Sequence, residues 1–153
     1  MIRQSNYLFD KRNRLAGFTL IEMLTVVAIL VVISALSYPF FTRLILQNFV
    51  NDTANNLVGN LRRAQFYAMT SKDSSNWQVN YSNSKVTLVE SGNGTVFGTY
   101  TISPGVSVTG PSQIIFSNPT GLPSNTGTFT VVDGNITETV TIDSQGVASA
   151  SQY

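Results

Sequence analysis

Hydrophobic and polar positions divide the chain into three regions with different periods. In the first region, apolar residues run almost without interruption from Phe18 to Phe41, and residues 23–41 contain no charged side chain. As an α-helix, about 24 residues extend roughly 36 Å. That length is enough to cross a bilayer core of about 30 Å. The pattern therefore predicts a transmembrane helix over residues 18–41.

A cleaved secretory signal is the main alternative for this region. Such a signal has an apolar stretch of about 7–15 residues that ends in small residues at an A-x-A-like site. The stretch here is longer, and its end, SALSYPFF, is a poor cleavage site. Residues 1–17 form a basic leader, which we expect to stay on the cytoplasmic side of the membrane. Its charged residues are Arg3, Asp10, Lys11, Arg12 and Arg14.

Two residues interrupt the apolar segment. Pro39 lacks an N–H and clashes with the preceding turn, so we expect a helix kink there, the alternative being that the helix ends. Glu22 places a carboxylate one helical turn after Phe18, where a charge is costly and usually marks function. The alternative is an interfacial glutamate with no role. A functional Glu22 needs a cationic partner, and the apolar segment contains none.

The second region has a helical period with apolar residues on one side only. This spacing predicts an amphipathic helix over residues 42–72 that packs on a globular domain. Gly59 lies within it, costs about 1 kcal/mol relative to alanine and suggests close packing. The apolar positions are Phe49, Val50, Ala54, Leu57, Val58, Leu61, Ala64 and Ala68.

The third region, residues 73–153, alternates apolar and polar positions. Its short segments are rich in β-branched residues and are separated by turn signals such as Asp133–Gly134–Asn135, which predicts a hairpin within TVVDGNITETVTI. The fold class is therefore α+β, with a long N-terminal α-helix packed on a C-terminal, mostly antiparallel β-domain. We expect the aromatic residues to form the core of the sheet: Trp77, Tyr81, Phe97, Tyr100, Phe116 and Phe129.

Composition narrows the chemistry. The chain contains no cysteine and no histidine, which excludes disulfides and thiolate metal sites and removes the commonest general base. An enzyme that uses carboxylates or a Ser–Lys pair remains possible, but the composition argues against one, and we predict no catalytic residue, no metal site and no cofactor. The acidic residues Asp133, Glu138 and Asp143 do not have the spacing of an EF-hand loop, and we expect them to be surface charges of a hairpin.

The segment GFTLIEMLTVVAILVVISALSYP, residues 17–39, resembles the N-terminal signature of type IV pilins and type II secretion pseudopilins. The shared features are a short basic leader, Gly17, Phe18, a glutamate at Glu22, an apolar helix and a proline at Pro39. The resemblance implies that a prepilin peptidase cleaves between Gly17 and Phe18, removes the leader and N-methylates Phe18. The new amine would give Glu22 its cationic partner, within its own subunit or a neighbouring one, and so assist assembly.

Two further stretches, NLRRAQFYAMTSKDSSNWQVNY and IIFSNPTGLPSNTGTFTVVDG, resemble GspH/FimT-type minor pseudopilins. The resemblance implies a structural subunit of a type IV pilus or a type II secretion pseudopilus, not an enzyme. Its partners would be prepilin peptidase, other pilin or pseudopilin subunits, the inner-membrane assembly platform and, before assembly, membrane lipid. The chain would be a single-pass protein of the bacterial inner membrane and then part of an extracytoplasmic filament.

Two alternatives remain open from the sequence. The first is a tip or minor pilin that binds DNA or a surface ligand. The C-terminal segment DSQGVASASQY lacks the arginines of members thought to bind DNA, and the body beyond the leader is slightly acidic, which argues against a nucleic-acid partner. We expect the basic pair Arg62 and Arg63 to be a solvated helix face or a subunit contact. The second alternative, of another class, is an uncleaved, single-pass membrane-anchored enzyme or receptor domain.

Overall fold

The computed structural model describes residues 17–82 and 84–152, with only the backbone described at residues 38, 39 and 152. Most of the predicted leader, residues 1–16, therefore lies outside the described residues. The chain divides into two compact units, Met1–Pro39 and Phe40–Tyr153.

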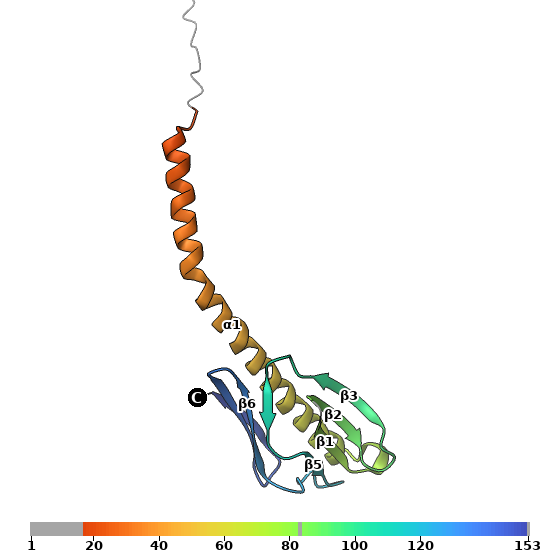
Figure 1. Cartoon of the computed structure of the whole chain (residues 1–153). Helices are drawn as coiled ribbons and strands as arrows, with labels where there is room; N and C mark the ends of the chain where they lie inside the picture. The colour runs from red at the N-terminus through yellow and green to blue at the C-terminus, as the bar shows by residue number, and fades with distance from the viewer. Residues whose placement is uncertain (1–16, 83, 153) are drawn as a thin grey trace, which may run out of the picture. The chain divides into compact units, whose positions relative to one another are not determined.

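One long helix, α1 (Leu20–Met69), contains the apolar segment and the amphipathic region and includes Pro39 (Figure 1). This confirms the predicted N-terminal helix; the kink at Pro39 stays a prediction. The one-sided stripe from Val50 to Ala68 is buried as expected, whereas Phe49 is 38% exposed. The helix stops before the predicted end at residue 72 because Ser71 adopts a left-handed backbone. A short 3₁₀ turn, η1 (Lys72–Ser74), follows.

Eight strands form two four-stranded antiparallel sheets in the described part of the chain. The order is β3-β2-β1-β5 in one sheet and β4-β6-β7-β8 in the other. Each strand corresponds to a segment that the alternating pattern predicted, which confirms the antiparallel β-domain. The strands are β1 (Trp77–Ser82), β2 (Lys85–Glu90), β3 (Val96–Thr101), β4 (Ser107–Thr109), β5 (Gln113–Phe116), β6 (Gly127–Asp133), β7 (Ile136–Ile142) and β8 (Ala148–Gln152).

The predicted hairpin joins β6 to β7. Asp133 pairs with Ile136, so only Gly134 and Asn135 form the connection. Gly134 has φ 59°, a left-handed value that glycine adopts without the steric cost that a Cβ would bring. The turn therefore fixes the register by which β6 and β7 pair over their full lengths.

The core lies between the buried stripe of α1 and the two sheets. Leu57 and Leu61 of the helix belong to one cluster with Trp77, Phe116 and Phe129, all of them almost fully buried. These three aromatic residues confirm the predicted core. Tyr81 and Tyr100 are half-buried and pack against this cluster, whereas Phe97 is 46% exposed, contrary to the prediction.

Polar side chains of α1 tie the helix to the loops and strands beyond the core. Arg62 donates to the Ala148 carbonyl oxygen from Nε at 3.3 Å and from Nη2 at 3.0 Å. Gln65 Nε2 donates to the carbonyl oxygens of Gln145 at 2.7 Å and Gly121 at 3.3 Å. Arg62 is therefore an anchor for β8, and the two neighbouring arginines do not act as one free basic pair.

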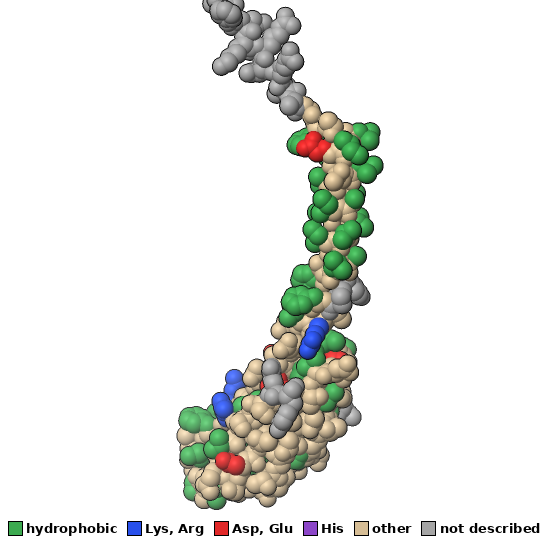
Figure 2. Space-filling view, turned by 90° about the vertical axis from the view of Figure 1, so that its left-hand side faces the viewer, with side chains coloured by type: hydrophobic (Ala, Val, Ile, Leu, Met, Phe, Trp, Pro, Cys, Tyr) green, Lys and Arg blue, Asp and Glu red, His purple; other side chains and the backbone are tan. Residues whose placement is uncertain are grey.

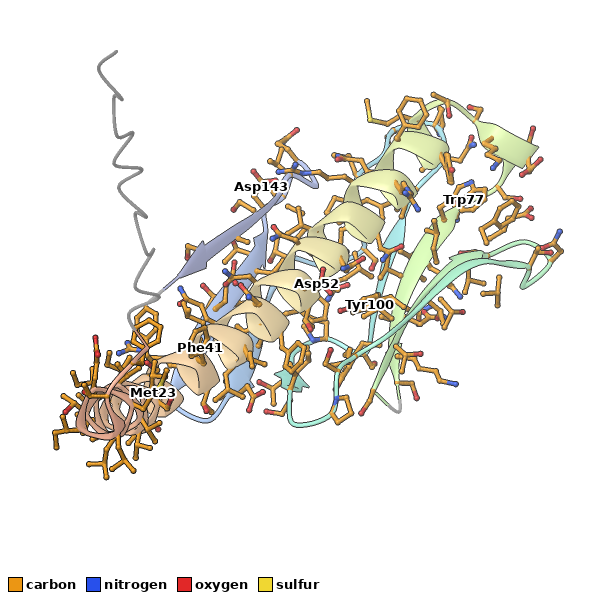
Figure 3. All side chains as sticks on the ribbon, turned by 90° about the horizontal axis from the view of Figure 1, so that it is seen from above. Met23, Phe41, Asp52, Trp77, Tyr100 and Asp143 are labelled. Atoms are coloured by element: carbon orange, nitrogen blue, oxygen red, sulfur yellow. The ribbon has the colours of Figure 1, made fainter. Side chains whose placement is uncertain are left out.

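A third tie joins α1 to β3. Tyr100 Oη donates to Asp52 Oδ2 at 2.8 Å (Figure 3). Burial raises the pKa of the Tyr100 phenol above its ordinary value, and the Asp52 carboxylate raises it further. The phenol therefore remains a donor at neutral pH, and its contribution to stability is lost as the pH rises through the folded-state pKa.

The acidic residues of the second sheet differ from the surface charges that we expected. Asp133 and Glu138 are buried, and burial raises the pKa of the Glu138 carboxyl. Asp143 is exposed, but its Oδ1 accepts from the backbone N–H groups of Gln145 and Val147, each at 2.9 Å. Asp143 thus shapes the turn before β8.

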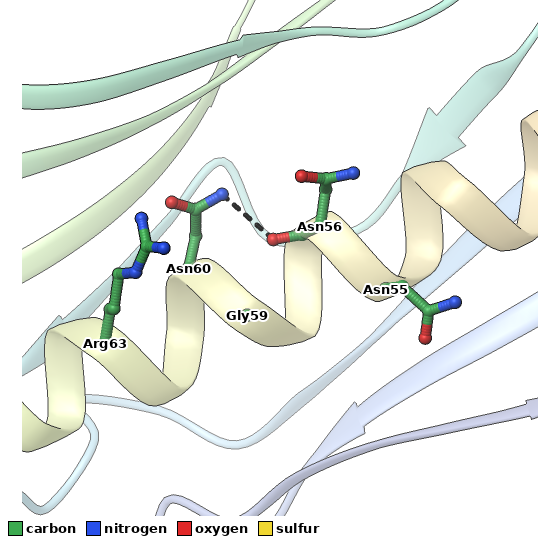
Figure 4. Close-up of a pocket in the computed structure, with 5 residues that line it drawn as sticks. All are labelled: Asn55, Asn56, Gly59, Asn60 and Arg63. Carbon is green, nitrogen blue, oxygen red and sulfur yellow. Dashed lines mark hydrogen bonds between the residues drawn. The ribbon is translucent and has the colours of Figure 1, made fainter.

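Gly59 does not mark close packing, contrary to the sequence prediction. A Cβ at this position would meet no heavy atom within 4 Å. The residue lies in a shallow polar hollow on the exposed side of α1, with Asn55, Asn56, Asn60 and Arg63 around it (Figure 4). Asn60 Nδ2 in this hollow donates to the Asn56 carbonyl oxygen at 2.9 Å.

Gly59→Ala is expected to raise the free energy of unfolding by about 0.5–1 kcal/mol, because it reduces the backbone freedom of the unfolded chain without a clash. Gly121→Ala is the matched control. Gly121 has φ +67°, and a Cβ there would collide with the Met69 side chain, so stability should fall by about 1–2 kcal/mol from the backbone alone. Urea unfolding of the full chain in detergent, followed by Trp77 fluorescence, measures both. Equal effects of the two substitutions would contradict this account.

Candidate functional site

The candidate site is the start of α1, where Gly17, Phe18 and Glu22 lie within a few residues of one another. Residues 17–19 are not helical, and α1 begins at Leu20. The Gly17–Phe18 peptide bond is therefore outside the helix. Both residues are exposed, Phe18 to 73%. A Cβ at Gly17 would meet no heavy atom within 4 Å, so the described structure itself does not require glycine there.

Thr19 caps the helix. Its Oγ1 accepts a hydrogen bond from the Glu22 backbone N–H at 3.2 Å, and its carbonyl oxygen accepts from the Met23 N–H at 3.2 Å. A threonine at this position satisfies one of the N–H groups that a helix start otherwise leaves without a partner. The sequence analysis missed this role, although the spacing Thr-x-x-Glu of Thr19 and Glu22 is the signal of a capping box.

The cap gives Glu22 a second physical role. It lies in the first turn of α1, where a carboxylate is stabilised by the positive end of the helix dipole. This local effect explains an acidic residue at a helix start in any solvent. It does not explain why a carboxylate lies at the edge of a long apolar surface, where a charge in lipid is costly.

The apolar segment is exposed on every side. Each described residue from Gly17 to Leu36 is exposed, including Leu20 at 82% and Leu36 at 74%. Figure 2 shows green hydrophobic side chains along the visible face of this segment. Among the described residues, one helix is long and apolar enough to cross a membrane, and its most apolar stretch is not buried within the protein.

Three hydroxyl groups of this segment are satisfied within the helix. Thr25 Oγ1 donates to the Ile21 carbonyl oxygen at 2.8 Å. Ser34 Oγ and Ser37 Oγ donate in the same way, to carbonyl oxygens four residues earlier, at 2.7 Å and 2.9 Å. Because an unsatisfied polar group in hydrocarbon costs several kcal/mol, these bonds make the segment suitable for lipid. Of its polar groups, Glu22 is the one that carries an ionisable charge.

Of three comparisons with known proteins, two found a similarity. A sequence profile of the prokaryotic N-terminal methylation motif matches residues 12–38. A search of curated proteins found no significant match. Two solved structures of the minor pseudopilin EpsH from the type II secretion system of Vibrio cholerae are similar, with TM-scores of 0.56 and 0.57 at 12% and 11% identity. They match 67% and 69% of this chain and 96% and 94% of their own.

The chain thus carries the N-terminal methylation motif of type IV pilins, and its fold is that of minor pseudopilins. The motif covers Gly17, Phe18 and Glu22, whose individual roles stay predictions.

Thr19→Val removes the side-chain acceptor at the helix start while keeping the size of the residue. The amides of the first turn should then exchange with solvent about fivefold faster, since loss of such a cap costs about 1 kcal/mol. Hydrogen exchange of the full chain in detergent micelles, followed by NMR at Glu22 and Met23, measures the change. Thr19→Ser keeps the acceptor and should exchange like the unmodified chain. Unchanged exchange in Thr19→Val would contradict the capping role.

Proposed function

We propose that this chain is a subunit of a type II secretion pseudopilus or a type IV pilus, processed by a prepilin peptidase and assembled from the inner membrane. One observation carries the proposal: the methylation motif, residues 12–38, includes an apolar helical surface that no other described part of the chain covers. An exposed apolar surface of this extent marks an interaction with lipid or with other protein surfaces. A filament subunit contacts lipid before assembly and other subunits after it.

In this proposal the first step is cleavage between Gly17 and Phe18. The bond lies in exposed, non-helical chain, which is the form a protease can bind. Glycine is not needed by the fold at position 17, so the need for a small residue comes from the peptidase. Cleavage removes the basic leader, which would be costly to draw into lipid, and leaves Phe18 with a free amine that the same enzyme methylates.

The second step is pairing of the Phe18 amine with a Glu22 carboxylate. Both residues lie at the start of α1, and Glu22 is exposed, so the carboxylate can meet the amine of its own chain or of a neighbour. In a filament core from which water is excluded, an unpaired carboxylate is strongly unfavourable. Pairing between subunits would therefore favour one axial offset between adjacent helices. Subunits, prepilin peptidase and the inner-membrane assembly platform are the partners that this route requires.

The mature N-terminus is the most direct test of processing. In cells with an active prepilin peptidase, mass spectrometry should find a chain that begins at Phe18 and carries one additional methyl group. Gly17→Leu should block cleavage, because the peptidase must accommodate a small residue there, and the leader should be retained. A native chain that keeps Met1 would favour a single-pass membrane-anchored enzyme or receptor domain instead.

Glu22→Gln separates the charge of Glu22 from its place in the cap, because glutamine can still serve at this position of a capping box. We expect normal cleavage but a decrease of about tenfold or more in sheared filament that contains this chain. The reason is that a buried charge without its partner costs about 3–5 kcal/mol. Immunoblots of sheared and membrane fractions measure the ratio, with Thr25→Val as a control that leaves the charge in place. A normal filament yield from Glu22→Gln would exclude the pairing.

A further inference from the structure

Three aromatic rings surround the ammonium group of Lys72 in the globular unit. Lys72 Nζ lies 4.1 Å from the ring centroid of Tyr67, 4.3 Å from that of Phe97 and 5.1 Å from that of Trp77. The rings also pack edge to face, with centroids 4.7 Å apart for Tyr67–Trp77 and for Trp77–Phe97. We call Tyr67, Trp77 and Phe97 the aromatic cage. Figure 3 shows Trp77 beside the last turns of α1.

The cage has the chemistry of an organic-cation site. Ring faces attract a cation through their quadrupoles, and cages of aromatic rings recognise trimethylammonium groups. The three rings come from α1, β1 and β3, so the fold holds them in place independently of Lys72. Trp77 is fully buried, whereas Phe97 is 46% exposed, which leaves one wall of the cage open to solvent.

The backbone that places Lys72 in the cage is strained. Ser71, Asp73 and Ser74 all have left-handed backbones, with φ 51°, 56° and 51°. This conformation is uncommon for residues other than glycine, and such strain persists only where surrounding contacts hold it. Trp77 Nε1 donates to the Lys72 carbonyl oxygen at 3.2 Å. Because this bond holds the Lys72 backbone beside the cage, exchange would require rotation of the Lys72 side chain alone.

We propose that the aromatic cage binds a trimethylammonium group of a soluble compound, and that Lys72 is a built-in competitor that exchanges with it. Tyr67, the helical member of the cage, follows Phe41 by 26 residues of α1, or roughly 39 Å. This length of helix between the end of the apolar segment and the cage favours a soluble compound over a lipid head group as the ligand. The site is independent of filament assembly, since all its residues belong to the unit Phe40–Tyr153.

Competition by Lys72 predicts that variants at this position differ in their affinity for an external cation. The apparent affinity for an external cation is reduced by the fraction of molecules whose cage is open. Removing the Lys72 ammonium should therefore tighten binding, whereas replacing it with another cation should not. The single tryptophan of the chain lies in the cage, so its fluorescence reports occupancy without a label.

The experiment titrates tetramethylammonium chloride into the full chain in a maltoside detergent, against sodium chloride at equal ionic strength. The unmodified chain should show a weak, saturable change in Trp77 emission, and Lys72→Ala should bind about tenfold more tightly. Lys72→Arg should remain as weak as the unmodified chain. Phe97→Leu changes an exposed ring, so the fold should survive, and it should abolish the response.

Three results would overturn the proposal. Absence of a saturable response in both the unmodified chain and Lys72→Ala would show that the cage is not a site. Binding by Lys72→Ala alone would show that Lys72 is a permanent clamp and does not exchange. A response to added phosphatidylcholine vesicles but not to tetramethylammonium, with phosphatidylglycerol vesicles as the control, would assign the site to lipid and exclude a soluble ligand.

Discussion

A helix that is apolar around its whole circumference cannot remain in water, and this constraint governs the first part of α1. No other described residue covers its side chains from Phe18 to Leu36, so their environment must be lipid or other protein. The globular unit has the opposite character, because the apolar stripe of α1 is covered by two sheets. One helix therefore carries two different surfaces, and the boundary between the two compact units falls within it, after Pro39.

Periodicity was sufficient to predict most of the fold. The change from a continuous apolar run to a one-sided helical stripe, and then to alternation, marks each change of environment. The eight described strands all lie in residues 73–153, where alternation predicted a β-domain, and the Asp133–Gly134–Asn135 turn joins the hairpin expected there. These features depend on neighbours along the chain, which is why a single sequence reveals them. The motif residues Gly17, Phe18 and Glu22 could be recognised for the same reason, although the Thr19 cap was overlooked.

Features that depend on contacts between distant residues could not be predicted. The link from Arg62 to Ala148 spans 86 positions, and no local pattern distinguishes it from a solvated arginine. Phe97 occupies an apolar position in the alternating pattern, yet its ring lies beside the Lys72 ammonium and is partly exposed to solvent. Gly59 suggested a close approach that the helix does not make. In each case the environment of the residue depends on how the helix and the sheets pack together, and that information lies outside any short window of sequence.

The hydroxyl groups of Thr25, Ser34 and Ser37 have one further consequence. Each is bonded to a carbonyl oxygen of its own helix, so none must exchange a partner when the surroundings of the segment change. Moving the segment from a lipid bilayer into a bundle of similar helices would leave its internal hydrogen bonds intact. Of the polar side chains described in this segment, only the carboxylate of Glu22 would then need a different partner in the two environments. The three hydroxyl groups would not require local unfolding when the segment leaves the bilayer.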